Sequence, residues 1–125
     1  MTSTAVDVGA AGDFESGVLK RVEAGGRALV VVREGERVFA LRDICSHRGA
    51  RLSDGVLTGT ALPCKPGEEI RYGRRGEIVR CPWHGWEFDL ATGRSLTEPG
   101  RERVRSYPAF LRDGRVFVEV QPLRA

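Results

Sequence analysis

Two short pairs of metal-ligating residues constrain this chain more than any other feature of its sequence. One residue separates Cys45 from His47 in the first arm, and two residues separate Cys81 from His84 in the second arm. These are the only two histidines in 125 residues, and each lies within three positions of a cysteine. Because thiolate sulfur and imidazole nitrogen both bind transition metals strongly, the pattern indicates a metal centre held by two loops.

Three kinds of site fit the two arms. A structural zinc ion accepts two cysteines and two histidines, but a zinc finger groups Cys with Cys and His with His, and it needs a helix. The four side chains could also be unligated, although glycine- and proline-rich loops that carry so many reactive groups are seldom idle. A Rieske [2Fe–2S] centre holds one iron by two cysteines and the other by two histidines. Each arm here would supply one cysteine to the first iron and one histidine to the second.

Composition is that of a soluble globular protein, with 41% hydrophobic and 30% charged residues. We expect a single domain over residues 1–125. The longest apolar stretch, 28–32, has the length of a strand, well short of the roughly 18–20 residues that a membrane span needs. The N-terminus has neither a basic start nor an apolar segment, so we expect no secretory signal and a cytoplasmic location.

The basic charge is carried almost entirely by arginine, since Lys20 and Lys65 are the only lysines in a chain of net charge +3. The arginines are spread along the sequence without interleaved aromatic residues, which argues against nucleic-acid binding. A small positive balance is compatible with simple solubility or with a mild preference for acidic partners. The cysteine count is three, and an odd number in such a chain argues against a disulfide framework.

The hydrophobic pattern predicts an all-β fold with little helix. Apolar runs of strand length recur between turn signals, 16 glycines are spread along the chain, and no window offers an amphipathic helix of three turns. Residues 1–12 form a loose lead-in that could add one edge strand, and Asp113-Gly114 predicts a tight hairpin turn. The expected strands are 17–22, 27–33, 37–41, 77–80, 86–89, 107–111 and 116–120.

The amino-acid sequences of the two arms resemble those of one known family. Cys45-Ser46-His47-Arg48-Gly49 and Cys81-Pro82-Trp83-His84-Gly85-Trp86 are similar to the cluster-binding loops of Rieske proteins. They look most like the Rieske ferredoxins and Rieske domains of aromatic-ring-hydroxylating dioxygenase systems, and the resemblance covers roughly residues 15–121. It implies the Rieske fold, in which antiparallel sheets form an incomplete barrel with a small cluster-binding subdomain, here with its loops at about 44–55 and 80–90.

The same resemblance implies the roles of the ligands. Cys45 and Cys81 would hold the inner iron of one [2Fe–2S] cluster per chain, and His47 and His84 would hold the outer iron. The arms are separated by 33 residues, more than most members of the family have, and the excess at about 57–76 indicates an inserted loop or hairpin. Cys64 lies in this insertion, and we expect it to be a free cysteine.

Four positions set the expected type of cluster. Respiratory Rieske proteins carry a disulfide and two hydroxyl donors around the cluster. The positions that match the disulfide cysteines are Ala50 and Trp83 here, and those that match the hydroxyl donors are Trp86 and Phe88. None of these residues can supply the disulfide or the hydroxyls. Since hydrogen bonds to the cluster sulfurs raise the reduction potential, we expect a potential at the lower end of the Rieske range, roughly −150 mV.

The residues available favour an electron carrier rather than a complete enzyme. A catalytic oxygenase needs a second iron on two histidines and a carboxylate, but both histidines are assigned to the cluster. We therefore expect a ferredoxin-like component that receives electrons from a flavoprotein reductase and supplies an oxygenase or another oxidoreductase, with no nucleic acid or membrane as partner. Two alternatives stay open: a small non-catalytic reductase subunit of the nitrite reductase type, and a redox-sensing interaction module.

Overall fold

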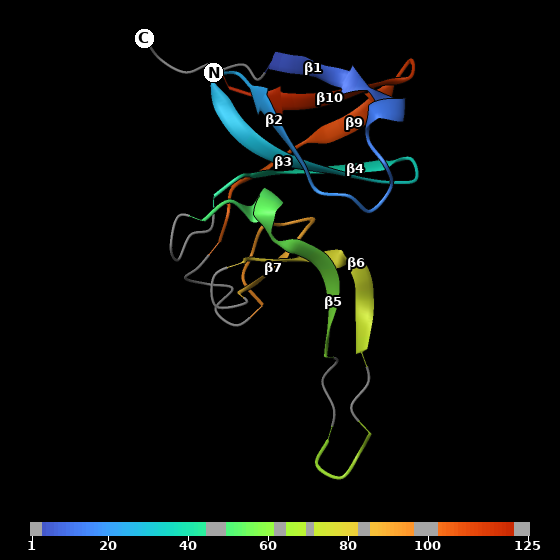
Figure 1. Ribbon diagram of the computed structural model, residues 1–125, viewed down its shortest axis with the longest axis vertical. Helices are drawn as coiled ribbons and strands as arrows, with labels where there is room; N and C mark the ends of the chain where they lie inside the picture. Colours follow the sequence, from blue (N-terminus) through green and yellow to red (C-terminus); the bar gives the residue numbers. More distant parts are fainter. Residues whose placement is uncertain are drawn as a thin grey trace.

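The computed structural model describes residues 4–44, 50–61, 65–69, 72–82, 86–96 and 103–121. Within these residues the chain forms ten strands in three antiparallel sheets, with two short 3-10 helices (Figure 1). The elements are β1 (Thr4–Ala10), η1 (Ala11–Asp13), β2 (Lys20–Ala24), β3 (Arg27–Glu34), β4 (Arg37–Arg42), η2 (Leu52–Asp54), β5 (Val56–Ala61), β6 (Tyr72–Arg80), β7 (Glu87–Asp89), β8 (Ser106–Tyr107), β9 (Ala109–Arg112) and β10 (Arg115–Val120).

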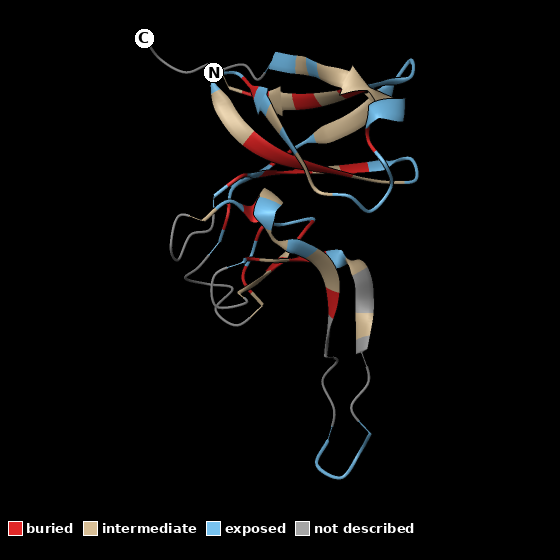
Figure 2. Cartoon of the chain, in the orientation of Figure 1, coloured by how far each residue is buried: buried red, intermediate tan, exposed pale blue. Residues whose placement is uncertain are grey.

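Strand β3 has both of its faces buried and so connects two hydrophobic cores. Leu29 and Val31 belong to the first core, whereas Val30 and Val32 belong to the second, and all four are fully buried. Successive side chains of a strand point to opposite faces, which is why a continuous apolar run is needed here. The β2–β3–β4–β8 sheet is therefore the middle layer of the molecule, and β3 is its most deeply buried strand (Figure 2).

The first core lies between the middle sheet and the β1–β10–β9 sheet. Val38 and Ala40 of β4 meet Val116 and Val118 of β10 there. The expected edge strand at the N-terminus is β1, which pairs with β10. The predicted hairpin turn is confirmed, since Asp113 and Gly114 both have positive φ, at 51° and 75°, and join β9 to β10.

The second core lies on the other face of the middle sheet, against the β5–β6–β7 sheet. Beyond this core, β5 and β6 extend away from the rest of the molecule as a long antiparallel hairpin (Figure 1). The turn residues 65–69 are exposed, and the Lys65 N–H donates to the Glu68 side chain at 2.8 Å. Residues 57–76, expected as an inserted loop or hairpin, therefore include most of β5 and the start of β6.

The all-β prediction is confirmed, but one expected strand is wrong. Residues 107–111 were expected to be continuous, whereas the structure divides them at Pro108 between β8 and β9. Proline has no N–H to donate, so the chain leaves the middle sheet there and joins the β1–β10–β9 sheet. The described residues form no helix with the length and apolar character that crossing a bilayer requires.

Candidate metal centre

Of the four predicted ligands, Cys81 lies in the described part of the chain. It follows the last residue of β6, and its side chain is buried at 1% exposure among the residues of the second core. Cys45, His47 and His84 lie outside the described residues, as do Cys64 and Trp83. The described residues include the segments on which the two arms are carried.

The second arm is held at both ends by strand pairing. Val79 and Arg80 of β6 pair with Phe88 and Glu87 of β7, and the Arg80 and Glu87 side chains form an ion pair at 2.9 Å. The Cys81 N–H then donates to the carbonyl of Trp86 at 2.7 Å, which closes a six-residue loop over 81–86. The paired strands thus fix the position and orientation of Cys81 at the end of β6, and a metal ligand has to be held in this way.

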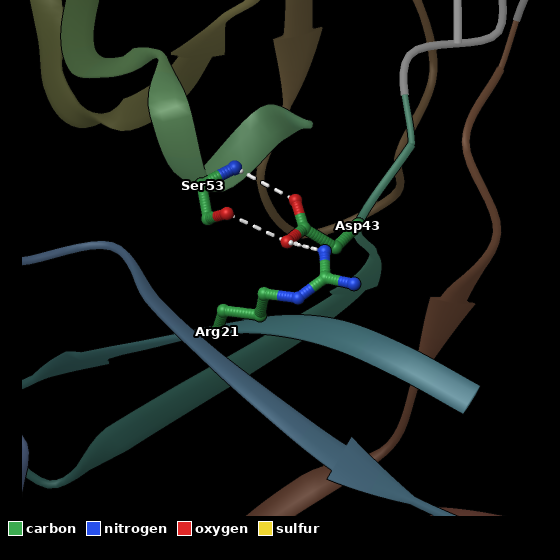
Figure 3. Close-up of polar contacts among 3 residues, drawn as sticks. All are labelled: Arg21, Asp43 and Ser53. Atoms are coloured by element: carbon green, nitrogen blue, oxygen red, sulfur yellow. Dashed lines mark hydrogen bonds and ion pairs between the residues drawn. The ribbon is translucent and has the colours of Figure 1, made fainter. Parts of the chain in front are cut away.

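The first arm is closed by a buried carboxylate. Asp43 lies two residues before Cys45, and its Oδ1 accepts the Ser53 N–H at 2.7 Å while Oδ2 accepts the Ser53 hydroxyl at 2.6 Å (Figure 3). Arg21 of β2 donates to the same Oδ2 at 2.7 Å. The Asp43 side chain is fully buried and that of Arg21 is 35% exposed, so the carboxylate charge is neutralised where water does not reach it.

Sequence reasoning did not single out Asp43, Ser53 or Arg21. The one signal in the sequence is an acidic residue directly after the apolar strand β4, at a position that turns out to be 5% exposed. A carboxylate there needs partners, because burial of an unpaired charge is strongly unfavourable. The partners come from residues 22 positions before and 10 positions after Asp43, and no local pattern links them.

The two arms are anchored to each other as well as to the core. Ala50 and Leu52, which follow the first arm, pack in the second core together with Cys81 and Trp86 of the second arm. Val56, at the start of β5, pairs with Arg80. The approach beside this pair is so close that a Cβ on Gly55 would lie 2.0 Å from the Arg80 carbonyl oxygen. The residue before Cys81 therefore touches the segment that leaves the first arm.

These residues fit a cluster held by two loops. The segments that carry the two arms share one core and one strand pair, and the predicted ligand Cys81 is a buried thiol at the end of a strand. Two thiols and two imidazoles form the donor set of a Rieske centre, in which one iron binds the two thiolates and the other binds the two imidazoles.

Comparisons with known proteins agree with this arrangement. The sequence profile of the Rieske [2Fe-2S] domain matches residues 4–108. The chain is 34% identical to the ferredoxin component of the p-cumate 2,3-dioxygenase system of Pseudomonas putida, over 86% of this chain and 79% of that protein.

Two solved structures of similar length share the fold. The ferredoxin of carbazole 1,9a-dioxygenase from Nocardioides aromaticivorans IC177 superposes with a TM-score of 0.74 at 27% identity, covering 96% of this chain and 99% of that one. A chain from the complex of reduced oxygenase and oxidised ferredoxin in carbazole 1,9a-dioxygenase gives a TM-score of 0.70 at 26% identity, with 97% of each chain covered. This chain therefore belongs to the Rieske [2Fe–2S] domain family, and its cofactor is a Rieske-type [2Fe–2S] cluster.

Proposed function

We propose that this chain is the ferredoxin component of an aromatic-ring-hydroxylating dioxygenase system and carries single electrons to the oxygenase. In this proposal Cys45 and Cys81 hold one iron, and His47 and His84 hold the other. A flavoprotein reductase supplies the electrons, and the cytoplasm is the site of the exchange.

The observation that carries the proposal is the extent of the similarity. The matched ferredoxins align over nearly their whole length, and the Rieske profile covers residues 4–108 of this chain. A complex of oxygenase and ferredoxin has been solved for carbazole 1,9a-dioxygenase. By transfer from that complex, we take an oxygenase to be the acceptor of this chain.

The content of metal-ligating residues supports a carrier rather than an oxygenase. The 125 residues contain two histidines, and both belong to the arms. A mononuclear iron of the two-histidine and one-carboxylate type would need two more. His47 and His84 would hold one of the two iron atoms, and the cluster would supply a one-electron redox change.

The residues of the chain itself keep the ligands in place. Asp43 and Ser53 close the first arm, and the Cys81–Trp86 hydrogen bond closes the second. Both arms rest on the same core, which contains Val30 and Val32 of β3. A ligand frame that is already rigid limits the movement that accompanies gain or loss of an electron.

A kinetic experiment tests the proposal. Holoprotein purified without oxygen is mixed with NADH and a flavoprotein ferredoxin reductase in a stopped-flow instrument, and bleaching of the visible absorption is followed. A carrier is reduced within seconds, takes up one electron per chain and can be reoxidised repeatedly. The Cys81→Ser variant serves as the control and should show no such cycle. Reduction over many minutes, accompanied by altered binding to another protein, would instead identify a redox sensor.

Subcellular fractionation tests the cytoplasmic location. Recovery of the iron-containing protein in the cytoplasmic fraction is the expected result. Recovery outside the cytoplasm would contradict that part of the proposal without affecting the cluster.

A further inference from the structure

We infer that an arginine-lined groove beside the first arm docks an acidic protein partner during electron transfer. This inference rests on the proposed carrier function and specifies the charge of the surface that the carrier meets. It concerns residues outside the predicted ligand set.

The groove consists of two adjoining cavities of about 530 and 600 Å³. Both cavities are lined by Arg42, Ile44 and Arg105, so they form one continuous depression along the end of β4 and the segment before β8. The Arg42 N–H donates to the Arg105 carbonyl at 2.8 Å, which fixes these two arginines side by side. Within the described ranges, six arginines line the groove: Arg21, Arg27, Arg42, Arg51, Arg103 and Arg105.

Positive charge is concentrated in this groove. Asp43 is the one acidic residue among the lining residues that the structure describes, and it is buried under Arg21 and Ser53. The whole chain has 20 basic and 17 acidic residues. Without the six arginines and Asp43, it would have 14 basic and 16 acidic residues. The described lining residues therefore carry a net charge of +5, whereas all other residues of the chain sum to −2.

Four of the six arginines lack an acidic partner in the part of the chain that the structure describes. Arg21 pairs with Asp43, and Arg27 donates to the carbonyl oxygens of Gly25 and Gln121. The other four are exposed, and none forms an ion pair with a described carboxylate: Arg42, Arg51, Arg103 and Arg105. Their charges are available to a second molecule, and arginine is the cation most enriched at the centre of protein interfaces.

The groove also holds an apolar contact point next to the first arm. Ile44 directly precedes Cys45 in the sequence, and 40% of its surface is exposed, which is unusual for a large hydrophobic residue of this chain. Arg51, which follows the first arm in the sequence, also lines the groove. An exposed aliphatic side chain surrounded by arginines has the composition of an interface core with a charged rim. A partner seated here would contact the segments that carry Cys45 and His47.

A protein surface fits this groove better than a small anion or a nucleic acid does. Pockets for small molecules are mostly apolar with a few fixed polar groups, whereas this groove is lined by long, exposed, charged side chains. Single-stranded nucleic acids are bound with aromatic residues on which bases stack, and Tyr107, the one aromatic residue of the described lining, is 7% exposed. A broad positive surface instead steers a carboxylate-rich protein into position and accelerates its association at low salt.

Electron transfer to proteins of opposite charge tests the inference. Holoprotein reduced with dithionite is mixed with cytochrome b5, an acidic acceptor, and separately with cytochrome c, a basic one, over a range of salt concentrations. Arg105→Glu is compared with Arg112→Glu, because both arginines are exposed and lie over an aromatic ring. The Cζ atom of Arg105 is 5.3 Å from the centroid of the Tyr107 ring, and that of Arg112 is 4.9 Å from the centroid of the Phe110 ring. Arg112 lies outside the groove, so the two variants carry the same charge change at different places.

The expected result has three parts. The wild-type rate constant with cytochrome b5 falls steeply as salt increases, Arg105→Glu lowers it about three- to tenfold at low salt, and Arg112→Glu lowers it less than twofold. The rate with cytochrome c is not reduced by Arg105→Glu. Equal effects of the two variants, or a rate with cytochrome b5 that does not depend on salt, would overturn the inference. Tight binding of inorganic pyrophosphate that Arg105→Glu abolishes would also overturn it, because the groove would then be a small-anion site.

The failure of this inference can be distinguished from the failure of the carrier function. If dithionite reduces no iron–sulfur centre, the proposed function itself is wrong. If the centre is reduced normally and its EPR spectrum is the same in wild type and Arg105→Glu, but the rates do not respond to charge, the docking surface alone is wrong.

Discussion

Asp43 and Ser53 are joined by two hydrogen bonds, one from the Ser53 backbone N–H at 2.7 Å and one from its hydroxyl at 2.6 Å. The two residues lie on either side of the first arm, so this contact closes the loop that carries Cys45 and His47. The same carboxylate accepts a hydrogen bond from Arg21, which ties the loop to β2. Closure of the first arm therefore depends on one buried side chain.

Replacement of Asp43 by asparagine is expected to lower the free energy of unfolding by about 2–3 kcal/mol. One carboxylate oxygen becomes an amide NH₂, which cannot accept from Ser53 or Arg21, and a hydrogen bond to a charged group is lost. We also expect less iron per purified chain, because the first arm is no longer held closed. Urea unfolding and iron analysis check both effects.

The matched control is Asp7→Asn. Asp7 also pairs with an arginine at 2.7 Å, but its side chain is 40% exposed and the pair lies between β1 and β10, away from the arms. Its replacement should change stability little and leave the iron content unchanged. Equal losses in the two variants would show that burial of Asp43 has no special importance.

Asp7 itself gives a prediction about pH. The hydrogen bond from the Arg115 guanidinium lowers the pKa of the Asp7 carboxyl below its ordinary value of about 3.9. The pair therefore stabilises the fold above that ordinary value, and the contribution is lost as the pH falls through the lower pKa of the folded state. NMR titration should show the lowered pKa in the wild type and a rise toward the ordinary value in Arg115→Gln. An unchanged pKa in that variant would contradict the assignment.

Gly55 is expected to tolerate no side chain. A Cβ there would lie 2.0 Å from the Arg80 carbonyl oxygen, so Gly55→Ala must push β5 away from the residue before Cys81. We expect a loss of about 3 kcal/mol in unfolding free energy, near the upper end for overpacking, together with a loss of bound iron. Gly12→Ala is the control, because no heavy atom beyond its two chain neighbours lies within 4 Å of its added Cβ. Thermal unfolding of both variants makes the comparison, and similar melting temperatures would refute the clash.

The sequence predicted the parts of the structure that depend on local patterns. The apolar run of β3 and the Asp113-Gly114 turn needed only the period of a strand and the backbone freedom of glycine. The arms were recognisable because Cys and His ligands at short spacing are rare by chance. The division at Pro108 was missed because the apolar pattern continues through it, and the missing N–H matters only once the pairing partners are known.

The features missed around the site are those made by tertiary contacts. The arginines looked scattered in the sequence, and Arg42 and Arg105 are indeed 63 positions apart. Pairing of β4 with β8 brings them together, and neither residue carries a local signal of this. The same holds for Asp43 and its partners. A sequence pattern identifies the candidate metal ligands, because their residue types and spacing are unusual. Only the fold shows which other residues hold the flanking segments in place.

The reduction potential should lie near the lower end of the Rieske range, at roughly −150 mV. Phe88 is fully buried and Trp86 packs against the same core, at the positions where respiratory members of the family have hydroxyl donors. Without those donors, the negative charge of the reduced state is less stabilised. A potentiometric titration followed by EPR checks the value, and a clearly positive potential would contradict this account.

The most direct test is the metal content of the protein measured together with its EPR spectrum. Protein purified without oxygen is analysed for iron, zinc and acid-labile sulfide, then reduced and frozen. We predict two irons and two sulfides per chain, and a spectrum with the low average g value of a cluster that has both nitrogen and sulfur ligands. One zinc per chain without sulfide, or the spectrum of a cluster with cysteine ligands alone, would contradict the assignment of Cys45, His47, Cys81 and His84 as a Rieske centre.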